Sequence, residues 1–135
     1  MKHEESVPRI LTVWGPAAVW AAVLFLLSAL PGVDDRIPIL FPGEDKVAHF
    51  VLYAVLGACL AWGRRRGGSR LPVGVLLLLG VAYGASDEWH QAFVPGRDPS
   101  VGDWAADTLG VVLGYTIFSS ILRRRGARNG SAGGA

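Results

Sequence analysis

The chain has 135 residues, of which 51% are apolar and only 18% charged, and its net charge is +2 at neutral pH. Its length fits one small domain, but its uncharged stretches are longer than a soluble core of that size can bury. The basic excess does not indicate nucleic-acid binding, because the basic residues flank apolar stretches, where membrane topology explains them. The single cysteine, Cys59, excludes an intrachain disulfide and a thiolate metal site within the chain.

Four apolar stretches predict four membrane-spanning helices. The first, residues 10–30, carries no charge, and as a helix it spans about 30 Å, the thickness of the hydrocarbon layer. Pro16 is expected to kink this helix near its start. The stretch is longer than the apolar part of a signal peptide and lacks a suitable cleavage triplet, so we expect it to be retained.

The second stretch covers residues 47–62, and its helix is expected to begin near Glu44, because a Pro-Gly pair precedes it and acids favour a first turn. The third is expected over residues 72–93, with two polar turns at its end. The fourth covers residues 104–122 and is closed by three arginines. Together they predict an all-α, integral membrane four-helix bundle in which short connections make neighbouring helices antiparallel.

The distribution of Lys and Arg predicts the orientation. With the N-terminus inside, ten of the 13 Lys and Arg residues lie on the cytoplasmic side and three on the outer side. Both termini are therefore predicted to be cytoplasmic. Residues 1–9 form a cytoplasmic segment, residues 10–122 the transmembrane domain, and residues 123–135 a basic cytoplasmic tail that we expect to be disordered.

Polar side chains recur at helical spacing at the predicted outer ends of three of these helices. Ionisable groups at membrane depth are costly, so they normally face the bundle interior and pair with one another. The spacing therefore predicts one shared ligand-binding site. Its candidate residues are Lys46, His49 and Tyr53 in the second helix, Asp87, Glu88 and Gln91 in the third, Arg97 in the following connection, and Asp103 and Asp107 in the fourth.

Several of these residues have simpler explanations, which the sequence leaves open. Asp103 can cap the fourth helix, since Ser100 and Asp103 precede its apolar stretch. Lys46 can extend to the lipid headgroups without binding anything. His90 can face the headgroups, because it lies about 100° around the helix from Gln91.

Candidates for catalysis are His49, Glu88 and Asp87, as general acids and bases. The chain has no HExxH motif and no close pair of histidines, so no metal site and no cofactor are predicted. Neither Ser86 nor Ser100 lies in a nucleophile elbow, and there is no glycine-rich phosphate loop.

Two strings resemble a known family. Residues 45–53 (DKVAHFVLY), followed by Leu56 and Gly57, resemble the first signature of the VanZ-like family, and residues 87–97 (DEWHQAFVPGR), followed by Asp103 and Gly110, resemble the second. The resemblance covers about residues 41–115. The family pattern usually has asparagine where this chain has Asp107, which puts in doubt any role there that needs an amide donor. The motif residues map to Asp45, Lys46, His49, Tyr53, Asp87, Glu88, Gln91, Pro95, Gly96, Arg97 and Asp103.

The resemblance implies a multi-span protein of the bacterial plasma membrane, in a family whose namesake is associated with low-level teicoplanin resistance. It implies no reaction. Three hypotheses follow: a binding protein for a polar or anionic envelope ligand, an enzyme acting on a lipid-linked envelope substrate, or a buried ion-pair network that only fixes helix packing. The expected partners are membrane lipid, a cell-wall precursor or a glycopeptide. The oligomeric state is not predicted.

Overall fold

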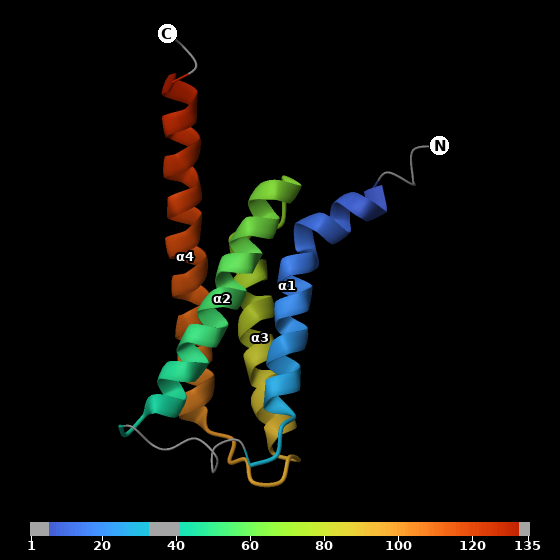
Figure 1. The fold of residues 1–135 in the computed structure, drawn as a ribbon, viewed down its shortest axis with the longest axis vertical. Coiled ribbons are helices and arrows are strands. Elements are labelled where there is room, and N and C mark those ends of the chain that lie inside the picture. Colours follow the sequence, from blue (N-terminus) through green and yellow to red (C-terminus); the bar gives the residue numbers. More distant parts are fainter. Residues whose placement is uncertain (1–5, 33–40, 133–135) are drawn as a thin grey trace.

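The computed structural model describes residues 6–32 and 41–132. This part of the chain forms four helices and no strand: α1 (Ser6–Ser28), α2 (Glu44–Gly67), α3 (Val73–Gln91) and α4 (Val101–Ala132). Successive helices run in opposite directions, so the start of α1 and the end of α4 lie at the same end of the bundle (Figure 1). The predicted all-α four-helix fold is confirmed, whereas the side of the membrane that each end faces stays a prediction.

Three segments are long and apolar enough to cross a membrane: Ile10–Ser28, Glu44–Gly67 and Val101–Arg128. Large apolar side chains such as Leu26, Leu78 and Ile117 are more than half exposed on the outer surface of the bundle, which suits contact with lipid. Helix α3 is not among the three segments, because its last turns carry Asp87 and Glu88 beside other polar residues. That α3 also crosses the membrane stays a prediction.

Helix α1 bends in its N-terminal part (Figure 1), and Pro16 lies inside it. Proline lacks the N–H for the i−4 bond and its ring displaces the preceding turn, which explains the bend. Two side-chain bonds hold the straight part of α1 against its neighbours. Trp20 Nε1 donates to the Leu52 carbonyl of α2 at 2.8 Å, and the Tyr83 hydroxyl of α3 donates to the Ala21 carbonyl.

Helix α2 begins at Glu44, as predicted, directly after Gly43, whose φ of 87° requires a glycine. It continues past its apolar stretch through three arginines to Gly67. Arginine is a good helix former, so only Gly68, with φ 59°, ends the helix.

Helix α4 begins at Val101, with Ser100 as its N-cap. The Ser100 hydroxyl accepts hydrogen bonds from the N–H groups of Gly102 at 3.0 Å and Asp103 at 3.4 Å. The capping role considered for Asp103 is therefore wrong, and its carboxylate is available for a contact across the bundle. The disorder expected for residues 123–135 is also wrong as far as residue 132, because α4 continues as helix to Ala132. No proline interrupts it, and its arginines and alanines favour helix; residues 133–135 lie outside the described part.

Helices α2 and α4 make the most extensive contact in the bundle. Small residues allow this approach: a Cβ at Gly110 or Gly114 would collide with the carbonyl oxygens of Phe50 and Ala54, respectively. Because these contacts involve backbone atoms, neither helix can give way without moving as a whole. The glycines therefore pack helices within one chain, which the sequence alone did not decide.

We expect Gly114→Ala to destabilise the fold by about 3 kcal/mol, because the added Cβ forces α2 and α4 apart. Thermal denaturation of the detergent-purified protein, followed by size-exclusion chromatography, measures the loss. Gly74→Ala is the matched control, since nothing lies within 4 Å of a Cβ there and alanine favours helix over glycine. Equal melting of Gly114→Ala and the wild type would contradict the close packing.

Candidate functional site

A cluster of polar side chains lies at the end of the bundle where α2 and α4 begin and α3 ends. We call it the polar cluster. Figure 1 shows these three helix ends together at the lower end of the bundle. The convergence predicted from helical spacing is confirmed, although the role of the residues in binding stays a prediction. The polar cluster consists of Lys46, His49 and Tyr53 of α2, Asp87, Glu88 and Gln91 of α3, and Asp103 and Asp107 of α4.

Two contacts, about one helical turn apart, join α2 to α4. Lys46 Nζ lies 3.0 Å from Asp103 Oδ1, and His49 Nδ1 lies 2.9 Å from Asp107 Oδ1. The helices run in the same direction, so the i, i+3 spacing on α2 matches the i, i+4 spacing on α4. Lys46 also contacts Asp45 at 2.8 Å, and its side chain is 46% exposed. It therefore does more than extend to the headgroups.

Helix α3 closes the cluster from the other side. The Tyr53 hydroxyl donates to Asp87 Oδ2 at 3.0 Å. Glu88 Oε2 accepts the Ser100 N–H at 2.8 Å, and its other oxygen, Oε1, lies 3.9 Å from His49 Nδ1. Among the acids of the polar cluster, Lys46 thus pairs with Asp103. Arg97, the remaining candidate, is half-buried in the connection between α3 and α4, where Gly96 has φ 76°.

The polar cluster is buried and rich in acid. Asp107 is 0% exposed, and Asp87, Glu88 and Asp103 are 6%, 8% and 7% exposed. The polar cluster contains four carboxylates and a single ammonium group, that of Lys46. The excess of carboxylates attracts cations and repels anions unless protons or bound cations compensate it.

Two carboxylate oxygens in the polar cluster have no hydrogen-bond partner within the described residues. They are Glu88 Oε1 and Asp107 Oδ2. A buried polar group left without a partner typically costs about 1–3 kcal/mol. Buried groups in native proteins are nearly always satisfied, so an exception calls for a reason such as a bound ion, a water molecule or a catalytic role.

The arrangement also offers ligands for a cation. One ring nitrogen of His49 and one carboxylate oxygen each of Glu88 and Asp103 lie within 4.8 Å of one another. A set of one imidazole and two carboxylates suits Mn²⁺ or Zn²⁺ better than Ca²⁺ or Mg²⁺, which prefer oxygen alone. The sequence contains no motif for this set, because its members come from three helices and meet only through packing.

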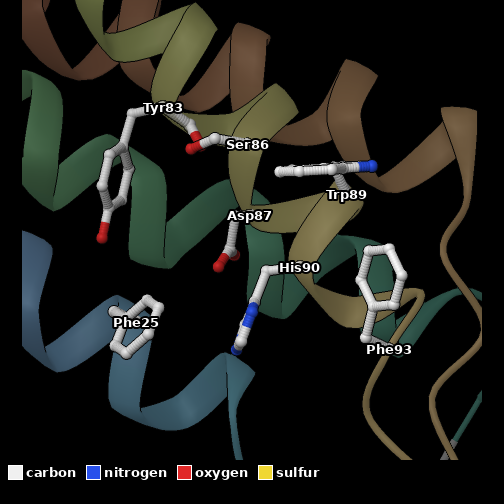
Figure 2. Close-up of a pocket in the computed structure, with 7 residues that line it drawn as sticks. All are labelled: Phe25, Tyr83, Ser86, Asp87, Trp89, His90 and Phe93. Atoms are coloured by element: carbon white, nitrogen blue, oxygen red, sulfur yellow. The ribbon is translucent and has the colours of Figure 1, made fainter.

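An apolar pocket adjoins the polar cluster, with a volume of about 450 Å³. Figure 2 shows Asp87 and His90 of α3 pointing toward Phe25 of α1, with Trp89 and Phe93 beyond His90. The His90 ring stacks on Phe25 with centroids 4.8 Å apart, so it does not simply face the headgroups. Sequence reasoning missed this pocket, since Phe25 lies in an apolar stretch where nothing distinguishes it from other lipid-facing residues. The lining comprises Phe25, Tyr83, Ser86, Asp87, Trp89, His90 and Phe93.

Fold and site together define a small all-α membrane protein with a buried acidic and histidine-containing cluster at one end. A protein-family model described as VanZ/LLP1 matches residues 18–123, and the chain therefore belongs to the VanZ/LLP1 family. The match extends the region of resemblance on both sides, into α1 and as far as Arg123 of α4.

A curated relative is the fission yeast (Schizosaccharomyces pombe) protein named "Uncharacterized protein C11E3.10". It is 29% identical over 103 residues, which cover 76% of this chain and 62% of that protein. The chain thus spans less than two thirds of the relative's length. No solved structure matches the chain. Because this relative is eukaryotic, family membership alone supports a membrane protein and not a bacterial one.

Proposed function

We propose that the chain binds a lipid-linked ligand of the cell envelope, with the polar headgroup at the polar cluster and the apolar part in the apolar pocket. The observation that carries this proposal is the position of Asp87. Its carboxylate accepts the Tyr53 hydrogen bond inside the polar cluster and also lines the apolar pocket. The two sites therefore adjoin each other and share Asp87, as an amphiphilic ligand requires.

The size and walls of the apolar pocket support this proposal. Pockets for small ligands usually hold about 300–1,000 Å³ and have mostly apolar walls with a few polar groups. Here the volume is about 450 Å³, and Phe25, Tyr83, Trp89 and Phe93 supply aromatic walls. The pocket lies between α1 and α3, beside exposed apolar side chains, so a membrane lipid would reach it without leaving the bilayer.

The charge of the polar cluster constrains the headgroup. An anionic headgroup is repelled by the excess carboxylates, because Lys46 is already paired with Asp45 and Asp103. A divalent cation held by His49, Glu88 and Asp103 would reverse that repulsion and bridge protein and headgroup. We therefore propose that the cluster takes an anionic headgroup together with such a cation.

The unpaired oxygens argue against a purely structural network. A network that served only helix packing would gain stability by satisfying Glu88 Oε1 and Asp107 Oδ2, or by replacing them with apolar groups. Both oxygens are buried without a partner in the described residues. A bound cation or headgroup would supply the missing contacts.

Acid–base catalysis on the same ligand is the second candidate function. The contact of His49 Nδ1 with Asp107 orients the imidazole, as a carboxylate does for a catalytic histidine. Glu88, with one oxygen unpaired, is the adjacent acid or base. Removing either His49 or Glu88 would then abolish turnover, whereas a binding site would lose affinity by degrees.

Profiling lipids and cell-wall precursors in a deletion strain, complemented with wild type, His49→Ala, Glu88→Gln or Asp98→Asn, tests both candidates. We expect an envelope lipid to change in amount on deletion and to be restored by wild type and by Asp98→Asn, whose carboxylate is exposed outside the cluster. A null phenotype for both cluster variants at wild-type protein level favours the enzyme. Unchanged pools and unchanged teicoplanin tolerance would contradict an envelope function at the bacterial plasma membrane.

A further inference from the structure

A second pocket lies at the opposite end of the bundle, between α2 and α4. Its volume is about 440 Å³, and three arginines line it: Arg64 and Arg65 from the end of α2 and Arg123 from α4. We call it the arginine pocket. Thr116 and Ser119 add hydroxyl groups to its wall, and apolar residues including Val73 and Leu122 complete it.

The arginines of this pocket have no carboxylate partner among the described residues. The described acids lie in the other half of the bundle, at positions 44, 45, 87, 88, 98, 103 and 107, and the ion pairs of the polar cluster involve Lys46 and His49. Arg64 Nε donates to the Leu71 carbonyl at 3.3 Å, and Arg123 Nη2 donates to Ser120 Oγ at 3.2 Å. Within the described part of the chain, no acid therefore compensates their positive charge.

Membrane topology explains why arginines follow apolar helices, but it does not explain why three of them line one pocket. Arginines on any face of a helix can set its orientation in the membrane. Here Arg65 lies against α4, where a Cβ at Gly126 would be 2.5 Å from its Nη2, so the glycine makes room for the guanidinium. Arg66, in the same turn, instead stacks over Trp62 at 4.6 Å and does not line the pocket.

We propose that the arginine pocket binds the phosphate of an anionic membrane lipid. Guanidinium groups bind phosphate oxygens in a bidentate manner, and hydroxyls add further donors. Basic pockets between membrane helices bind anionic headgroups elsewhere, and this pocket lies where the apolar part of both helices ends. The apolar wall residues would contact the glycerol and first acyl carbons. This inference does not depend on the proposed function of the polar cluster.

Native mass spectrometry of the full chain in detergent tests the proposal, with phosphatidylglycerol and phosphatidylcholine as probes. We expect phosphatidylglycerol to bind at least tenfold more tightly than phosphatidylcholine. Arg65→Gln with Arg123→Gln should weaken phosphatidylglycerol binding at least tenfold, because hydrogen bonds to charged groups are strong. Arg66→Gln removes one equal charge from the same turn and should leave binding within about twofold, as surface charges outside a site contribute little.

Three results would overturn the proposal. Equal binding of the two lipids would show that the pocket does not select charge. Equal loss in Arg66→Gln and Arg65→Gln, measured singly, would show a diffuse electrostatic effect and no site. Full displacement of phosphatidylglycerol by millimolar inorganic phosphate would assign the pocket to free phosphate, whereas failure to compete supports the lipid.

Discussion

We expect addition of Mn²⁺ or Zn²⁺ to raise the melting temperature of the detergent-purified protein by several degrees, and Glu88→Gln to remove this effect. The ligand atoms of His49, Glu88 and Asp103 lie within 4.8 Å of one another, and Glu88 Oε1 is buried without a hydrogen-bond partner. A ligand that binds only the folded state at 100 times its Kd stabilises that state by about 2.7 kcal/mol. Thermal denaturation with and without each ion, after chelator treatment, measures the shift.

Asp98→Asn is the matched control for this experiment, because it removes a carboxylate that is exposed outside the polar cluster. It should keep the full shift, and Asp103→Asn should lose most of it. Mg²⁺ at the same concentration should act weakly, since an imidazole is a poor ligand for it. Stabilisation that is the same in wild type and Glu88→Gln would place the ion elsewhere on the protein.

The helices, and the end of the bundle that holds the polar cluster, could be predicted because they depend on the pattern of neighbouring residues. Apolar stretch length, the Pro-Gly pair before Glu44 and the turn at Gly96 are each properties of a few neighbouring residues. The convergence of polar side chains followed from helical spacing and the high cost of exposing charge to lipid. The ionisable groups were accordingly expected to pair with one another, and Lys46 pairs with Asp103.

Features that depend on how helices rotate and cross were not predictable from one sequence. Spacing shows that Asp103 and Asp107 share a face of α4, but it does not show that α2 meets this face in matching register. The glycines at positions 110 and 114 set that register by allowing backbone contact with Phe50 and Ala54. The three-residue cation set and the contact of Phe25 with His90 both follow from such packing.

Two replacements of Asp107 separate the contribution of its hydrogen bond and volume to stability from the contribution of its negative charge. Asp107→Ala should destabilise the fold by about 3–5 kcal/mol, the usual cost of removing one partner of a buried pair. His49 Nδ1 would lose its contact at 2.9 Å, and a side chain that is 0% exposed would leave a cavity. Unfolding of the detergent-solubilised protein by heat or denaturant measures the difference.

Asp107→Asn should instead be at least as stable as the wild type. The amide oxygen can still accept from His49 Nδ1 if that nitrogen carries the proton, and the amide nitrogen replaces Oδ2, which has no partner in the described residues. Asparagine has nearly the same shape as aspartate, so the amide should fit at this position without displacing its neighbours. Because His49, Glu88 and Asp103 are unchanged, the stabilisation by Mn²⁺ or Zn²⁺ should persist. Equal destabilisation by asparagine and alanine would show that the buried negative charge itself holds the helices together. That result would support the purely structural network, which the unpaired oxygens argue against.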